Sequence, residues 1–290
     1  MKVLLIGATG MLGREMVQQF QKINWDITTI AQSKCDITMD IVKDFDKLVD
    51  IITFNSYEIV INTAAMINLA DCEQNPDQAY LLNTRIPGLL SKVCQRKGAY
   101  YIQISTDHYY TGDLNLPHKE KDDTFLVNEY AKTKYFGEIL TRQYSNSLVI
   151  RTNIVGFKGI KEKPTFIEWV IETLTEEKEI IGFTDFYTSS IDVESFTVIL
   201  IQLILKNVTG TINIASSEVI SKYEFIIQIA RKLNKEYLVK PGSLKGFSEE
   251  VERADSLGLC IEKLTHLIGK EYVPSAEQVI RNLMNRYKEM

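Results

Sequence analysis

Residues 1–13 read MKVLLIGATGMLG, and this stretch decides the fold. The apolar run 2–6 is short and ends in glycines, which indicates a buried strand that turns into a helix. We expect Gly7 to permit a tight turn, Gly10 to let the backbone approach a phosphate, and Gly13 to let the helix pack close to the strand. Free N–H groups at the helix start would then face a pyrophosphate. The predicted cradle comprises Gly7, Thr9, Gly10, Met11, Leu12 and Gly13.

Strand-like and helix-like stretches alternate through the first half of the chain. The predicted strands are 2–6, 26–31, 58–63, 100–105 and 148–151, and the predicted helices are 11–22, 41–54, 76–97 and 129–144. Apolar strands separated by helices imply right-handed crossovers and a parallel sheet that is covered on both faces. The sequence therefore predicts an α/β fold with a Rossmann-like, doubly wound parallel sheet, whose ligands bind beyond the carboxyl ends of the strands.

The end of the second predicted strand bears on the choice of cofactor. The three glycines between the first predicted strand and the first predicted helix favour nucleotide binding over a tight turn that binds no ligand. Folds of this kind that take NAD usually carry an acid after the second strand, where it holds the ribose hydroxyls. Here Gln32, Ser33 and Lys34 follow the strand, so Ser33 and Lys34 are candidates to hold a 2′-phosphate. The sequence favours NADPH, with NADH as the alternative if Lys34 is only an exposed loop residue.

Helical patterns dominate after about residue 155. The predicted helices are 165–178, 193–206, 222–234 and 275–288, with one clear strand at 210–215. We therefore expect an NAD(P)-binding Rossmann-like domain at 1–155. A smaller, mostly helical substrate-binding lobe is expected at 156–290, with some chain returning to the sheet.

Bulk composition narrows the classes of partner and site. The 290 residues are 45% hydrophobic and 24% charged, with a net charge of −5, which is ordinary for a globular protein. Lys and Arg are spread along the chain, so the charge indicates neither a nucleic acid nor a membrane surface as a partner. The longest later apolar stretch, 198–205, is too short to span a bilayer. The oligomeric state stays open, with a homodimer as the assembly to test.

The cysteines and histidines show no metal-binding pattern. The four cysteines are widely spaced, without a Cys-x-x-Cys pair or a His cluster nearby: Cys35, Cys72, Cys94 and Cys260. We therefore expect no metal site and no disulfide framework. This usage is typical of a cytoplasmic protein.

A tyrosine and a lysine supply the candidate proton chemistry. Tyr130 and Lys134 are four residues apart in a predicted helix, so they share one face. A free Tyr has a pKa near ~10, but a neighbouring ammonium favours the phenolate and eases proton exchange. Lys134 can also hold the cofactor ribose, and Thr106 ends a strand where it can hydrogen-bond a substrate carbonyl. The Tyr-x-x-x-Lys spacing alone is common on solvated helices. Because it follows the glycine turn and the strand that ends at Thr106, it predicts hydride transfer to that carbonyl, with Tyr130 as the proton donor.

With these motifs the chain resembles the extended short-chain dehydrogenases/reductases. Within that superfamily it is most similar to the dTDP-4-dehydrorhamnose reductases and related sugar-nucleotide-binding proteins. The resemblance runs nearly end to end. It is carried by residues 7–13, 60–65, 83, 105–107, 130–138 and 151–156, with a weaker match at 253–259.

The resemblance implies a function and a set of site residues. The implied activity is NAD(P)H-dependent reduction of a 4-keto group on a nucleotide-activated deoxysugar. The implied catalytic residues are Thr106, Tyr130 and Lys134, and the implied cofactor-lining residues include Ala64, Ala65 and Asn83. The candidate substrate residues are Asp107, His108, Asn153 and Arg253. For His108 the alternative is a packed or half-exposed loop residue.

Departures from the family pattern leave the sugar and the base of the substrate open. Ala131 stands where the family often has Gly, and His108 to Tyr110 replace the family's Tyr-Val-Phe. Related 4,6-dehydratases have Glu after the Asp, so His108 after Asp107 argues against dehydration. Two alternatives remain, a nucleotide-sugar epimerase and a non-catalytic NADP-binding regulatory subunit. The missing acid after the second strand disfavours the first, and the intact Thr, Tyr and Lys set disfavours the second.

Overall fold

A computed structural model describes residues 1–246 and 251–290, and the chain divides into two compact units. Unit 1 comprises Met1–Thr106, Leu126–Arg151 and Ile201–Ile212. Unit 2 comprises Asp107–Phe125, Thr152–Leu200 and Asn213–Met290. The chain therefore crosses between the units several times, whereas the sequence predicted one boundary after residue 155, with some of the later chain returning to the sheet. Each unit is described by itself below.

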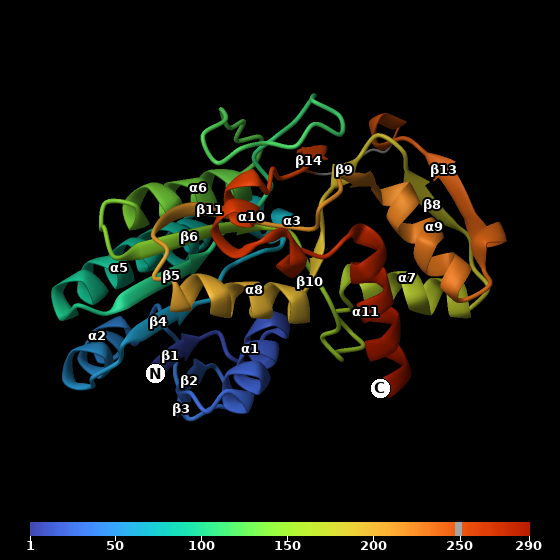
Figure 1. The fold of residues 1–290 in the computed structure, drawn as a ribbon. Coiled ribbons are helices and arrows are strands. Elements are labelled where there is room, and N and C mark those ends of the chain that lie inside the picture. Colours follow the sequence, from blue (N-terminus) through green and yellow to red (C-terminus); the bar gives the residue numbers. More distant parts are fainter. Residues whose placement is uncertain (247–250) are drawn as a thin grey trace. The chain divides into compact units, whose positions relative to one another are not determined.

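Unit 1 is built on a seven-stranded sheet with helices packed on it (Figure 1). The strands are β1 (Lys2–Ile6), β2 (Asp26–Ala31), β3 (Ile37–Thr38), β4 (Ile59–Asn62), β5 (Tyr100–Ile104), β6 (Ser147–Thr152) and β11 (Gly210–Ile214). The helices are α1 (Met11–Lys22), α2 (Phe45–Phe54), α3 (Leu69–Gln74), α4 (Pro76–Tyr80), α5 (Ile86–Lys97) and α6 (Glu129–Thr141), with a π-helical turn η1 (Leu81–Arg85). Strand pairs from β3 to β6 are parallel, which confirms the predicted doubly wound sheet.

The sheet is buried because its strands are apolar on both faces. Strands β4 and β5 are buried at every position, and alternate residues point to opposite faces. On one face, Leu4, Val60 and Tyr101 pack in a cluster with side chains of α2 and α5. Helices α5 and α6 lie side by side, as Figure 1 shows.

The strand order reverses at the carboxyl end of β1. The order is β11-β6-β5-β4-β1-β2-β3, so β1 pairs with β2 on one side and with β4 on the other. The chain therefore leaves β1 in one direction and later returns to its opposite side. In doubly wound sheets, ligands bind at such a reversal of strand order. The glycine turn follows β1 at this point.

Two predicted helices differ from those in the structure by more than three residues at one end or by an interruption. The predicted helix 41–54 begins only at Phe45, because the Asp40 carboxylate accepts hydrogen bonds from the backbone N–H groups of Val42 and Lys43 at 3.0 and 3.2 Å. Such local bonds compete with helix formation. The predicted helix 76–97 is interrupted by η1, where one turn widens. Helical periodicity in the sequence does not reveal a single widened turn.

Unit 2 contains helices and small sheets of two or three short strands. Its strands are β7 (Ile154–Val155), β8 (Ile180–Phe183), β9 (Tyr187–Thr188), β10 (Ile191–Asp192), β12 (Ile220–Ser221), β13 (Val239–Gly242) and β14 (Ser256–Leu257). Its helices are α7 (Phe166–Thr175), α9 (Lys222–Lys232), α10 (Glu262–Ile268) and α11 (Ala276–Glu289), with 3₁₀ turns η2 (Glu236–Leu238), η3 (Leu244–Gly246) and η4 (Lys270–Tyr272). Helix α8 (Val193–Leu205) begins in unit 2 and ends in unit 1. In the described ranges 1–246 and 251–290, no helix is long and apolar enough to cross a bilayer.

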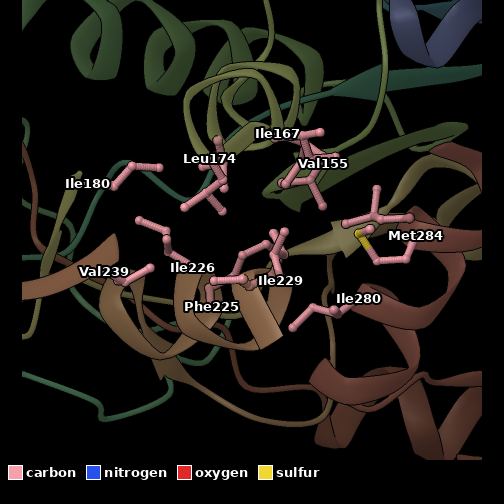
Figure 2. Close-up of a cluster of buried hydrophobic side chains, with 14 of the residues drawn as sticks. Val155, Ile167, Leu174, Ile180, Phe225, Ile226, Ile229, Val239, Ile280 and Met284 are labelled. Carbon is pink, nitrogen blue, oxygen red and sulfur yellow. The ribbon is translucent and has the colours of Figure 1, made fainter. Parts of the chain in front are cut away.

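The core of unit 2 is formed by α7, α9 and α11 with β8 and β13. Figure 2 shows Phe225 and Ile229 of α9 between side chains of α7 and α11, with Leu174 and Ile280 among their neighbours. Helix α9 begins at a capping box, in which Ser221 and Glu224 bond each other's backbone N–H groups. The cap fixes where α9 starts, and therefore which face it buries.

Phe225→Ala should lower the free energy of unfolding by about 3–5 kcal/mol, because Phe225 is 1% exposed and its removal leaves a cavity in this core. Urea denaturation measures the change. The matched control is Phe125→Ala, since Phe125 is 53% exposed and should change stability by less than about 0.5 kcal/mol. Equal losses in the two variants would contradict the assignment of this core.

Candidate functional site

The glycine turn after β1 has the predicted tight geometry. Gly7 has a φ of +88°, in the region that favours glycine, and its N–H donates to the Ile30 carbonyl at 2.8 Å. The Gly10 N–H donates back to the Gly7 carbonyl at 3.1 Å, which closes the turn. A side chain at Gly7 would also collide with Thr63. The turn therefore requires glycine at position 7.

Gly13 and Gly10 have different reasons to lack a side chain. A Cβ on Gly13 would collide with the backbone of Gly7 and Ala8, so Gly13 is needed for α1 to pack on the turn. A Cβ on Gly10 would meet only the Gly7 carbonyl oxygen, at 3.3 Å. Gly10 has a φ of −68° and a ψ of 168°, which other residues adopt readily. The fold itself therefore demands Gly13 far more than Gly10.

The N-terminus of α1 has the features of an anion site. Gly10 is the N-cap, and within the described residues no side chain caps the helix there. The first turn carries no acid, so the positive end of the helix dipole is not neutralised. The first N–H groups of a helix lack partners within it. These N–H groups can donate hydrogen bonds to a phosphate, which is the role that the sequence predicted for them.

Ser33 and Lys34 follow β2 at the same edge of the sheet. Strands β1 and β2 are parallel and Ile6 pairs with Ile30, so the segment after β2 lies beside the glycine turn. Both side chains are exposed, and Lys34 has a φ of +54°. The structure thus brings the candidate 2′-phosphate residues to the cradle edge.

Asn83 ties the loop after β4 to α6. Its side-chain amide accepts from the Met66 N–H and donates to the Met66 carbonyl, both at 2.9 Å, and it also donates to Thr133 Oγ1 at 3.2 Å. The residue is 2% exposed. Ala64 and Ala65 lie in this loop, both partly exposed. These contacts favour a positioning role for Asn83, and direct lining of the cofactor remains a prediction.

Lys134 is held at the end of β5 that leads to Thr106. Its Nζ donates to the Ile104 carbonyl at 2.7 Å. Burial lowers the pKa of Lys134 to about 8, although the charge of Glu138 acts in the opposite direction. Tyr130 lies one turn earlier on the same helix and is 8% exposed, while Thr106 is 3% exposed. Unit 1 therefore brings the Lys134 helix and the Thr106 strand end together.

A buried ion pair that the sequence did not reveal fixes α6 to the sheet. The Glu138 carboxylate accepts from Arg151 Nε at 3.1 Å and from its Nη2 at 2.9 Å. Ser105 Oγ also donates to Glu138, at 2.6 Å. Asn128 caps α6 by accepting from the Ala131 N–H at 2.8 Å. Two signals in the sequence pointed to this arrangement: an Asn directly before the helix, which is a typical cap, and a Glu four residues after Lys134 on the same helix face.

The candidate substrate residues lie in unit 2, where two of them are bonded to each other. Asn153 Nδ2 donates to Asp107 Oδ2 at 2.8 Å, and Ser190 Oγ donates to Asn153 Oδ1 at 2.9 Å. His108 is partly exposed, and desolvation followed by the charges of Lys222 and Arg253 lowers its pKa to about 4. The His108 imidazole is therefore neutral at pH 7. Lys222 was not among the residues predicted from the sequence.

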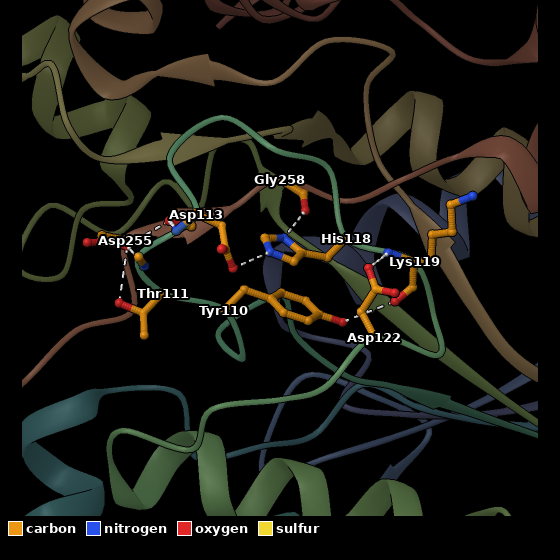
Figure 3. A network of polar contacts seen from close by, with 10 residues as sticks. Tyr110, Thr111, Asp113, His118, Lys119, Asp122, Asp255 and Gly258 are labelled. Carbon is orange, nitrogen blue, oxygen red and sulfur yellow. Dashed lines mark hydrogen bonds and ion pairs between the residues drawn. The ribbon is translucent and has the colours of Figure 1, made fainter.

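The segment 107–125 is held by a polar network in unit 2 (Figure 3). The ring of Tyr110 stacks on His118 with centroids 3.9 Å apart. His118 contacts the Asp113 carboxylate at 3.1 Å and the Gly258 carbonyl at 3.0 Å. Asp255 accepts from Thr111 Oγ1 at 3.1 Å. Residues 111–118, which follow Asp107 and His108, are therefore anchored to the stretch after Arg253.

Substitutions of Gly10 and Gly13 should have separate effects, one on NADPH binding and the other on folding. Gly10→Val should fold normally but lose binding of NADPH, because its side chain would cover the helix N-terminus. Gly13→Val should lose folded protein, because its side chain would collide with backbone. Circular dichroism and NADPH titration measure the two effects. Normal NADPH affinity in a folded Gly10→Val protein would contradict the cradle assignment.

Comparisons with known proteins give the relatives of this chain. The probable low-salt glycan biosynthesis reductase Agl14 of Haloferax volcanii is 26% identical over 233 residues, which cover 78% of this chain and 78% of that protein. Methionine adenosyltransferase 2 subunit beta of Bos taurus is 33% identical over 139 residues, 47% of this chain and 41% of that protein. The crystal structure of dTDP-4-dehydrorhamnose reductase from Bacillus anthracis in complex with NADP has a TM-score of 0.88 to this chain at 23% identity. The superposition covers 98% of this chain and 99% of that chain.

The family follows from a match over nearly the whole sequence. The family described as the RmlD substrate binding domain matches residues 1–288. The matched range includes the glycine turn, the helix of Tyr130 and Lys134, and the segments of unit 2 around Asp107 and Arg253. The chain therefore belongs to the RmlD substrate binding domain family, within the extended short-chain dehydrogenases/reductases.

Proposed function

We propose that this chain uses NADPH to reduce the 4-keto group of a nucleotide-activated deoxysugar, with Tyr130 as the proton donor. At the level of the family, the chain is an NAD(P)H-dependent oxidoreductase of the sugar-nucleotide reductase type. One observation carries the proposal. Lys134 Nζ is bonded to the Ile104 carbonyl at 2.7 Å, so the Tyr130 helix is fixed at the strand end that carries Thr106.

The residues around the glycine turn fit a dinucleotide. The turn leaves the N-terminus of α1 open, and Gly10 keeps that surface free of a side chain. The cofactor pyrophosphate would lie on these N–H groups, and Ser33 and Lys34 would hold a 2′-phosphate. When bound, NADPH supplies the hydride. The relative from Bacillus anthracis, solved with NADP, supports this choice of cofactor.

The proton chemistry rests on side chains of unit 1. Thr106 would hydrogen-bond the substrate carbonyl oxygen, and Tyr130 would give its proton to the same oxygen. The ammonium of Lys134, one turn away, would stabilise the phenolate that remains. Since the pKa of Lys134 is about 8, Lys134 is protonated in most molecules at pH 7. The buried Glu138 beside it helps to keep the lysine charged.

A regulatory subunit is the second candidate function. It is favoured by the 33% identity to methionine adenosyltransferase 2 subunit beta, although that match covers 47% of this chain. The two candidates differ in turnover. Oxidation of NADPH by a panel of nucleotide 4-ketosugars supports the reductase, whereas NADPH binding without turnover across that panel supports the subunit.

Tyr130→Phe should lower turnover by about 10²–10⁴-fold, because it removes the proton but keeps the ring in its packed position. Affinity for NADPH should stay within about twofold of the unmodified protein, which keeps all other cofactor contacts. Single-turnover oxidation of NADPH by a nucleotide 4-ketosugar measures the rate. Tyr135→Phe, on the same helix, is the matched control and should leave the rate unchanged. Full activity of Tyr130→Phe would remove Tyr130 as the proton donor.

Lys34→Ala should weaken NADPH binding by about tenfold and leave NADH binding nearly unchanged, because only NADPH carries the 2′-phosphate. Parallel fluorescence titrations with the two cofactors measure this difference. Lys22→Ala, at the far end of α1, serves as the control. Tighter binding of NADH than NADPH by the unmodified protein would overturn the cofactor preference.

A further inference from the structure

A chain of hydrogen bonds between two side-chain amides lies in the buried sheet of unit 1. Asn62 ends β4, and Gln103 of β5 pairs with it in register. Asn62 Nδ2 donates to Gln103 Oε1 at 2.9 Å, and Gln103 Nε2 donates to the Ile104 carbonyl at 2.9 Å. Asn62 is 0% exposed and Gln103 is 3% exposed. Burial of a polar amide is unfavourable unless it is hydrogen-bonded, so these bonds hold both side chains in fixed orientations.

A backbone N–H determines the direction of every bond in this chain. The Ala64 N–H donates to Asn62 Oδ1 at 3.1 Å, and because a backbone N–H can only donate, the amide nitrogen of Asn62 must face Gln103. The Gln103 oxygen therefore faces Asn62, and its nitrogen faces the Ile104 carbonyl. The Tyr101 hydroxyl donates to the same Gln103 oxygen at 2.5 Å. The bonds thus run in one direction, from the loop after β4 to the end of β5.

The Ile104 carbonyl joins this chain of bonds to α6. The same oxygen accepts a second bond, from Lys134 Nζ at 2.7 Å. A carbonyl oxygen has two lone pairs, so Gln103 and Lys134 together occupy both. Lys134 is 4% exposed and lies one turn after Tyr130 on α6. Because the amide takes one side of the oxygen, the ammonium is restricted to the other side.

We propose that Gln103 is a positioning residue for the proton transfer, and that it fixes the place on the Ile104 carbonyl at which Lys134 binds. Asn62 orients Gln103 for this role. The inference rests on the proposed function, in which Lys134 stabilises the phenolate of the proton donor. Gln103 acts through Lys134 and takes no direct part in proton or hydride transfer. Since Asn62 also holds the Ala64 N–H, one pair of amides sets both the lysine and the start of the loop after β4.

Gln103→Met removes the amide and keeps the length of the side chain. It should lower kcat with a nucleotide 4-ketosugar by about 10–100-fold, because a small misplacement of a catalytic group has effects of this size. The KM for the sugar should stay within about twofold, since the substitution does not alter the residues proposed to bind the substrate. Steady-state oxidation of NADPH measures both quantities. Full turnover by Gln103→Met would overturn the proposal.

A double-mutant cycle with Lys134 separates positioning from general damage to the fold. In a protein that already carries Lys134→Met, Gln103→Met should change single-turnover oxidation of NADPH by less than about twofold, because no ammonium is left to position. Independent effects would instead multiply. Equal fold losses in the two backgrounds would therefore contradict a role through Lys134. Asn62→Asp repeats the cycle if Gln103→Met does not fold, since a second acceptor facing Gln103 should turn its amide nitrogen away from Ile104.

Tyr101→Phe is the matched control within the same set of bonds. Tyr101 is 0% exposed and bonds the Gln103 oxygen, while the Gln103 nitrogen keeps its bond to Ile104. The substitution should lower the unfolding midpoint in urea, because a buried hydrogen bond is lost, yet leave kcat within about twofold. A loss of turnover as large as that of Gln103→Met would mean that any weakening of these bonds suffices, which contradicts the specific role of Gln103.

Affinity for NADPH tests the inference separately from the proposed function. If the unmodified chain oxidises NADPH with no 4-ketosugar, the proposed function fails, and NADPH titration then reads the same cycle, because Lys134 is predicted to hold the cofactor ribose. Gln103→Met should weaken NADPH binding by about fivefold when Lys134 is present, as for loss of one hydrogen bond, and have no effect on Lys134→Met. Equal losses in both backgrounds, no loss in either, or failure of the unmodified chain to bind NADPH would overturn the inference.

Discussion

The buried ion pair between Glu138 and Arg151 is the constraint on which the arrangement of unit 1 depends. Removing two charges from water is unfavourable, and the pair is stable here because Arg151 and Ser105 together satisfy the carboxylate. Loss of one partner from such a pair costs about 3–5 kcal/mol. Glu138 lies one turn after Lys134 on α6. The ion pair thus sets the height and rotation of the helix over β5 and β6, and with them the position of Tyr130.

Close packing transmits this constraint to the loop after β4. A Cβ on Gly137 would occupy the place of the Asn83 carbonyl oxygen, so α6 and η1 are in backbone contact. Asn83 then holds Met66 through two hydrogen bonds and Thr133 through a third. The loop after β4 and the proposed proton donor are consequently positioned by the same helix. A shift of α6 would disturb both at once.

Local spacing made much of the fold and part of the site predictable. Gly7 to Gly13, and Tyr130 with Lys134, are short patterns whose geometry follows from the turn and the helix in which they lie. Glu138 and Ser105 are 33 residues apart in sequence, so their bond depends on how strand and helix pack, and no spacing shows it. Lys222 reads in sequence as an ordinary solvated helix lysine. Only the three-dimensional approach of Phe166 and Phe186 shows that its ammonium lies over aromatic rings.

The π-helical turn at η1 holds one residue more than a regular helix would need. The Ile86 N–H bonds to the Leu81 carbonyl, which marks the widened turn. Deletion of one residue there would restore α-helical bonding without unwinding α5, whose Gly88 packs on Leu140 of α6. The residues before the deletion would instead rotate by about 100° around the helix axis. Asn83 would then turn away from Met66, so in evolution a change in the length of this segment would act on the loop after β4 while sparing the sheet and the helices packed on it.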